Sequence, residues 1–132
     1  MSSAETKANR PVSPHIQIYH WHLTMVMSIF HRATGIALYV GMALLAWWLL
    51  AAATGRGAFV FINGLLGSWV GLVVLFGLTW SLLHHMLGGL RHFIWDTGRG
   101  LGKPARDQLA LATIVGSGVL TVIVWIIGVA VA

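Results

Sequence analysis

Residues 79–98 read TWSLLHHMLGGLRHFIWDTG, a stretch that begins inside a long apolar run and ends among polar residues. Written as a helix, it places His85, Gly88, Gly89 and His92 at i, i+3, i+4 and i+7, which is one face. With a rise of ~1.5 Å per residue, the two histidines lie roughly 10 Å apart along the axis, close to the distance from a haem iron to its propionates. Because the glycines carry no side chain, a flat macrocycle can approach the backbone there. This face is therefore a candidate haem-binding surface on an apolar helix.

The composition indicates an integral membrane protein. Hydrophobic residues make up 58% of the 132 residues and charged residues only 8%, whereas a globular domain has about 25% charged residues. The acidic residues are Glu5, Asp96 and Asp107. A chain with so few charges cannot cover itself with polar surface, so the lipid bilayer is its expected solvent.

The formal charge of +5 does not indicate a nucleic-acid-binding protein, because the Lys and Arg residues flank apolar runs and form no basic stripe interleaved with aromatics. The lack of Cys excludes disulfides, thiolate-held iron–sulfur clusters and covalent attachment of a c-type haem. A redox cofactor in this chain therefore needs other ligands, and seven histidines are present.

Three apolar runs, at about 28–53, 65–95 and 108–131, are each long enough to cross a bilayer as a helix. The middle run exceeds the ~20 residues that a span needs, so we expect it to tilt or to extend beyond the hydrocarbon. Residues 10–22, which begin RPVSPH, are expected to form an extended segment at the membrane interface. The prediction is a single all-α transmembrane domain, residues 1–132, with three spans.

The distribution of Lys and Arg predicts the orientation of these spans. The N-terminal side and the second loop lie on the same side of a three-span protein and carry seven of the eight cations, whereas the first loop carries Arg56 alone. Since positive charge is retained on the cytoplasmic side, the N-terminus is predicted inside and the C-terminus outside. The seven cations are Lys7, Arg10, Arg32, Arg91, Arg99, Lys103 and Arg106.

One group of polar residues lies at the inner end of the first span. Ser28, His31 and Arg32 stand at i, i+3 and i+4, and polar side chains at membrane depth are costly unless they serve a function. This trio is suited to hydrogen-bond a quinone carbonyl and to stabilise the anion formed on reduction, and His31 or Arg32 could equally pair with haem propionates. The alternative is a snorkelling Arg beside a capping Ser.

A second group lies on the middle span. His84 and His85 are adjacent, so they diverge by ~100° and cannot both face one haem. His85 shares the glycine face with His92 and is the better ligand, while Arg91 and His92 are expected as a cationic pair at the water edge. Asp96 is expected either to orient these cations or to pair locally as a solvated acid of the loop. The alternative is a histidine that makes a hydrogen bond between helices and binds no metal. A zinc site is disfavoured because no acid or thiolate completes it.

The chain closely resembles the cytochrome b membrane-anchor subunits of succinate dehydrogenase, respiratory complex II. The resemblance rests on RPVSPHIQIYHW and SIFHRATG within residues 10–35, and on HHMLGGLRHFIWDTG at residues 84–98. The layout of three spans agrees over nearly the whole chain, and the Arg-Pro-x-Ser-Pro-His start is typical of the alphaproteobacterial and mitochondrial branch.

The resemblance implies roles for particular residues. The axial ligand of haem b is the histidine six residues before the Arg-His pair, here His85, and Ser28 and Arg32 line the ubiquinone site. His31, Arg32 and His92 hold positions near the haem propionates. The second axial histidine comes from a separate small anchor subunit in this family.

The resemblance also implies partners and a location. The chain is expected to dock an iron–sulfur subunit, and through it a flavoprotein subunit, and to be inactive alone. The rival readings are the anchor of a quinol:fumarate reductase, a cofactor-free structural anchor and a transport subunit. The initiator Met and the lack of a visible presequence favour the bacterial cytoplasmic membrane over the mitochondrial inner membrane.

Overall fold

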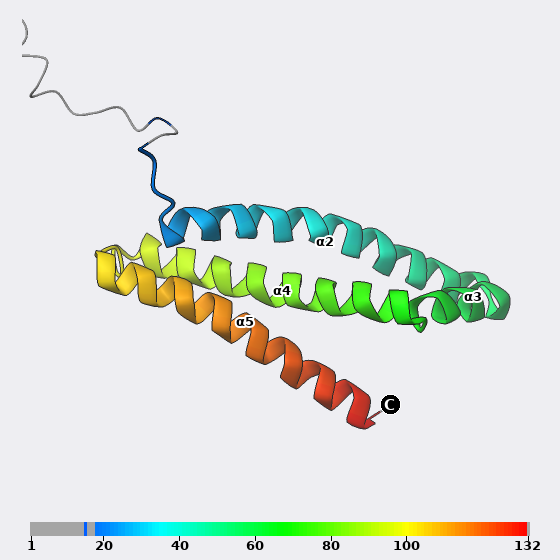
Figure 1. Cartoon of the computed structure of the whole chain (residues 1–132). Coiled ribbons are helices and arrows are strands. Elements are labelled where there is room, and N and C mark those ends of the chain that lie inside the picture. Colours follow the sequence, from blue (N-terminus) through cyan, green and yellow to red (C-terminus); the bar gives the residue numbers. More distant parts are fainter. Residues whose placement is uncertain (1–14, 16–17, 132) are drawn as a thin grey trace, which may run out of the picture.

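The computed structural model describes residue 15 and residues 18–131, and these form an all-helical bundle (Figure 1). The helices are α2 (Leu23–Thr54), α3 (Arg56–Leu66), α4 (Trp69–Asp96) and α5 (Lys103–Val131). Three of them, α2, α4 and α5, are long and apolar enough to cross a membrane. The predicted all-α fold with three candidate spans is confirmed, whereas the orientation across the membrane stays a prediction.

The helix boundaries follow from local backbone chemistry. Gly55 has a φ of 137°, a conformation that favours glycine, and there the chain turns from α2 into the short helix α3. Ser68 then caps α4, because its hydroxyl oxygen accepts a hydrogen bond from the backbone N–H of Gly71 at 3.2 Å. The helix that contains the predicted middle span therefore begins at Trp69, and residues 65 and 66 of the apolar run form the end of α3.

The end of α4 and the start of α5 are joined by a tight loop. Gly98 and Gly100 have φ values of 76° and 72°, and the indole N–H of Trp95 donates to the carbonyl of Gly100 at 3.2 Å. α5 begins at Lys103, five residues before the apolar run predicted to start at 108, since its first residues include the charged Lys103, Arg106 and Asp107. Of the predicted interfacial segment at residues 10–22, residues 10–14, 16 and 17 lie outside the described residues.

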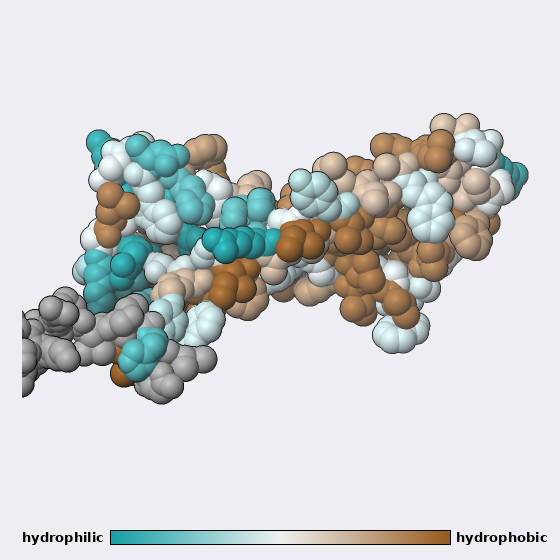
Figure 2. Space-filling view, turned by 90° about the horizontal axis from the view of Figure 1, so that it is seen from above, coloured by the Kyte–Doolittle hydropathy of each residue, from teal (hydrophilic) through white to brown (hydrophobic). Residues whose placement is uncertain are grey.

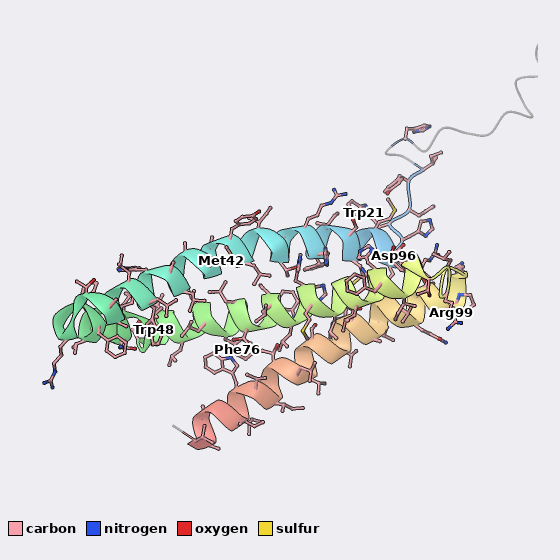
Figure 3. The ribbon with its side chains drawn as sticks, turned by 180° about the vertical axis from the view of Figure 1, so that it is seen from behind. Trp21, Met42, Trp48, Phe76, Asp96 and Arg99 are labelled. Atoms are coloured by element: carbon pink, nitrogen blue, oxygen red, sulfur yellow. The ribbon has the colours of Figure 1, made fainter. Side chains whose placement is uncertain are left out.

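α4 is the central helix and packs against both α2 and α5, while α3 folds back against α2 and α4. α5 crosses α4 at an angle, so that the two ribbons diverge toward the C-terminus (Figure 1), where the side chain of Trp125 still reaches Phe76 and Thr79 of α4. The start of α2, the end of α4 and the start of α5 meet at one end of the bundle. Figure 3 shows Trp21, Asp96 and Arg99 at this end, and Trp48 toward the other end beside α3.

Burial in this bundle is the reverse of that in a water-soluble protein. Among the described residues only four apolar side chains are fully buried, Met27, Ala51, Ile62 and Ala110, while large apolar side chains cover the outside. The buried polar residues are more numerous: Thr34, Ser81, His84, Arg91, Thr113, Ser117 and Thr121. Figure 2 shows the same division along the surface, with hydrophilic residues gathered at the end where α2 begins and hydrophobic residues over the rest. Lipid is the solvent that suits such an exterior.

Candidate functional site

The polar residues of α2 point in two directions. Ser28 and Arg32, four residues apart on one helix face, are both exposed. His31 turns instead toward α4, where its ring stacks on that of His85 with centroids 4.0 Å apart and planes inclined by 17°. The structure therefore separates the predicted trio into an exposed Ser–Arg pair and an inward-facing imidazole.

His85, on α4, is anchored to α2 through its Nδ1 atom. That atom lies 3.1 Å from the carbonyl oxygen of His31 and 3.5 Å from the hydroxyl of Thr34. A carbonyl oxygen can only accept, so Nδ1 carries the proton and donates. In the neutral ring Nε2 is then the unprotonated nitrogen, with its lone pair available for a metal. The packing of α2 on α4 thus selects the tautomer of His85.

His92 joins the same group of rings. Its centroid lies 5.6 Å from that of His31, in an edge-to-face arrangement, and the residue is exposed. We call His31, His85 and His92 the imidazole cluster. It brings together three of the predicted site residues at the polar end of the bundle.

His84 points away from the ring of His85 and toward α5, because adjacent residues of a helix diverge by ~100°. It is 1% exposed and lies 3.2 Å, through Nδ1, from the hydroxyl oxygen of Ser117 on α5. Its ring also packs against Trp80 at 5.1 Å and Phe30 at 6.3 Å. His85 is therefore anchored to α2 alone, whereas His84 contacts Ser117 of α5 and also packs against Phe30 of α2.

The glycines beside the cluster have different surroundings. A Cβ atom on Gly88 would collide with the ring of His31, lying 3.1 Å from its Nε2, whereas a Cβ on Gly89 would meet nothing within 4 Å. A Cβ on Gly35 of α2 would lie 3.1 Å from Cε1 of His85. Gly88 and Gly35 thus let α2 and α4 approach closely enough for the imidazoles to interlock. Of the two predicted clearances for a macrocycle, the structure fills the one at Gly88 with His31.

The expectation of a cationic pair at the water edge was wrong for Arg91. Arg91 is only 3% exposed, and its guanidinium carbon lies 5.0 Å from the ring centroid of Trp95. His92 is exposed, because adjacent residues of a helix diverge by ~100° and cannot both reach water here. Asp96 does not pair with either residue among those the structure describes, where the one ion pair joins Arg106 to Asp107 at 3.4 Å. Arg91 is thus oriented by an aromatic ring and not by Asp96.

The donor set at the imidazole cluster fits the single iron ligand that a shared haem needs from one chain. Nε2 of His85 is unprotonated and lies on an apolar helix. Nδ1 of the same ring donates to the backbone carbonyl of His31, an arrangement that orients metal-binding histidines. His31 cannot be the second axial ligand in this geometry, because two stacked rings present faces and not nitrogens to each other. No group of three or more His, Asp or Glu residues within the described ranges forms a site for a free metal ion.

The sequence did not assign two residues of this region to the site. Thr34 beside His85, and Ser117 beside His84, are buried hydroxyls that contact the two imidazoles. Ser117 lies in the small-residue triplet Gly116–Gly118 of an otherwise apolar span, which marks a close helix contact but not its partner. Only the packing register between α4 and α5 shows that Ser117 pairs with His84.

Comparison with known proteins gives a consistent result. The model of the succinate dehydrogenase/fumarate reductase transmembrane subunit family matches residues 6–125. The chain is 43% identical, over 121 residues, to the succinate dehydrogenase cytochrome b556 subunit of Paracoccus denitrificans, covering 92% of this chain and 93% of that protein. It is 32% identical over 117 residues to the cytochrome b556 subunit of Rickettsia felis, with 89% and 91% covered. It is also 40% identical over 110 residues to the mitochondrial cytochrome b560 subunit of Sus scrofa, with 82% of this chain and 65% of that longer protein covered.

Proposed function

The chain belongs to the succinate dehydrogenase/fumarate reductase transmembrane subunit family, and we propose that it anchors a succinate:ubiquinone oxidoreductase and provides one axial ligand of haem b. The predicted resemblance to the alphaproteobacterial and mitochondrial cytochrome b subunits is confirmed. The bacterial relatives and the three long apolar helices place it as a multi-pass protein of the bacterial cytoplasmic membrane.

The observation that carries the proposal is the hydrogen bond from His85 Nδ1 to the carbonyl of His31 at 3.1 Å. It holds Nε2 unprotonated and orients the ring, which is what ligation of a haem iron requires. His31 and His92 lie beside this ligand and are suited to hydrogen-bond the carboxylates of the haem. When bound, haem b supplies a centre that accepts and releases one electron.

The second axial ligand is proposed to come from another chain, a small membrane-anchor subunit. The stacked orientation of His31 on His85 argues against a second ligand from α2. His84 is also unsuited, since it lies in the α4–α5 interface with Ser117. One well-placed ligand per chain fits a haem held between two subunits.

The ubiquinone site is proposed at the exposed Ser28–Arg32 face of α2, at the polar end of the bundle. The hydroxyl of Ser28 can donate to a quinone oxygen, and the guanidinium of Arg32 stabilises the negative charge that develops there on reduction. The same end of the bundle is the proposed docking surface for the iron–sulfur subunit, which delivers the electrons, and through it for the flavoprotein subunit that oxidises succinate.

The test is a dithionite-reduced minus oxidised absorption spectrum of the purified complex. His85→Ala is expected to abolish the b-type signal. The matched control His84→Ala is expected to keep the signal, because its imidazole faces α5. A wild-type complex without haem, or loss of the signal only in His84→Ala, would refute the ligand assignment.

The family description also includes fumarate reductases, so the direction of the reaction needs its own measurement. The quinone potential and the soluble subunits set this direction. Faster succinate-driven ubiquinone reduction than quinol-driven fumarate reduction, in the same membranes, is the expected result. The reverse ratio would assign the chain to a quinol:fumarate reductase.

A further inference from the structure

The buried side-chain nitrogens that lack a hydrogen-bond partner, among the described residues, belong to three side chains in one region of the bundle. They are Nε2 of His31, Nε2 of His84, and Nε and Nη1 of Arg91. His84 and Arg91 are seven residues apart on α4, so they share a face and lie about 10 Å apart along the axis. Gly88 stands between them, and His31 Nε2 lies 3.1 Å from where its Cβ would be. The three groups therefore form a row at the junction of α2, α4 and α5.

The hydrogen-bonding capacities along this row are complementary. Arg91 has only donors. At the other end, the hydroxyl of Ser117 donates to the carbonyl of Ile114 at 2.9 Å, so the contact with His84 at 3.2 Å uses the Nδ1 proton of His84 as donor. Nε2 of neutral His84 is then an acceptor without a donor. Unsatisfied donors thus lie at one end of the row and an unsatisfied acceptor at the other.

The face of α5 that carries Ser117 offers one further acceptor, and the described residues offer no counter-charge. The hydroxyl of Thr113, which is buried on α5, donates to the carbonyl of Leu109 at 2.9 Å and keeps its lone pairs free to accept. Of the acids within the described ranges, Asp96 is exposed and Asp107 pairs with Arg106. The charge of Arg91 is therefore not balanced by a carboxylate of this part of the chain.

We infer that the α2–α4–α5 junction is an internal hydration site, in which a short chain of ordered water molecules joins the guanidinium of Arg91 to Nε2 of His84, past Nε2 of His31. Water is the ligand that fits, because one molecule can both accept from a guanidinium and donate to an imidazole nitrogen. Buried donors and acceptors left without partners are costly, and a span of roughly 10 Å is too long for a direct bond between the two residues.

The first test is water-edited solid-state NMR of the intact complex labelled with 15N-histidine, with the His84 signal assigned by its loss in His84→Gln. Rapid polarisation transfer from water to His84 Nε2 is expected, although the residue is buried. The transfer is expected to fall at least severalfold in Arg91→Met and to stay unchanged in the control Arg99→Met, whose side chain is exposed. A wild-type complex without this transfer, or an Arg91→Met complex that keeps it, overturns the inference.

The second test measures coupling, and the wild-type NMR result stands even where a variant fails to assemble. Residues that share no contact give additive effects on thermal stability. A bridging water chain predicts that the shifts of the melting temperature in His84→Phe and Arg91→Met are not additive, whereas His84→Phe and Arg99→Met are. Additivity in the first pair, or a density map with a carboxylate instead of water against Arg91, contradicts the proposed site.

Discussion

The close approach of α2 to α4 at Gly88 makes the substitution Gly88→Ala a sharp test of the site geometry. An added Cβ would lie 3.1 Å from Nε2 and 3.5 Å from Cγ of His31, and nearer still to Cδ2. The ring of His31 cannot shift freely, because it stacks on His85 at 4.0 Å and meets the ring of His92 at 5.6 Å. The clash must therefore be relieved by moving α2 or by breaking the cluster.

The size of the effect follows from two opposing contributions. Replacing Gly by Ala inside a helix stabilises the helix by about 1 kcal/mol, and overpacking a tight contact costs about 1–3 kcal/mol. Gly88→Ala is therefore expected to lower the stability by about 0–2 kcal/mol. In Gly89→Ala the added Cβ meets nothing within 4 Å, so this variant is stabilised by the helix propensity of Ala without a cost of overpacking. The two neighbouring variants should differ by about 1–3 kcal/mol in favour of Gly89→Ala.

The assay is thermal denaturation of the purified complex, followed by tryptophan fluorescence, beside the reduced-minus-oxidised haem spectrum. Gly88→Ala should melt earlier than Gly89→Ala, because only the former disturbs His31. Equal melting temperatures for the two variants would refute the close approach of His31 to Gly88. A loss of haem without a loss of stability in Gly89→Ala would support the predicted clearance of that position for the macrocycle.

Three further predictions concern other parts of the chain. Arg32→Ala should lower ubiquinone reduction by about 10²-fold, since a charge-stabilising donor is lost, while succinate-driven reduction of a soluble dye stays normal; an equal loss of both activities would indicate failed assembly. The indole of Trp125 donates to the hydroxyl of Thr79 at 3.2 Å, so Trp125→Phe and Thr79→Val should each destabilise by about 1 kcal/mol in thermal melts and the double variant by less than the sum; strict additivity would show that the bond contributes nothing. Gly100→Ala places a side chain at a φ of 72° and 2.9 Å from a leucine of α5, and it should destabilise by about 1–2 kcal/mol; Gly102→Ala, with an open position, is the control, and equal melting of the two variants would argue against this turn geometry.

Much of the architecture could be predicted because it depends on local properties of the chain. Long apolar runs with few charges require helices in lipid, since a bilayer offers no partner for free backbone groups. Helix geometry alone separates His84 from His85, because successive residues are rotated by ~100°. The sequence also placed His85 and His92 on one face, and both contact His31 in the structure.

Only the tertiary structure decided which face of each helix is inside. Arg91 and His92 are adjacent polar residues, and the packing of α4 against the other helices determines that Arg91 is buried and His92 exposed. Likewise, the pairing of His84 with Ser117 spans 33 residues and depends on the register between two antiparallel helices. A periodic pattern gives the faces of a helix, but its rotation relative to its neighbours comes from packing between distant segments, which no local pattern contains.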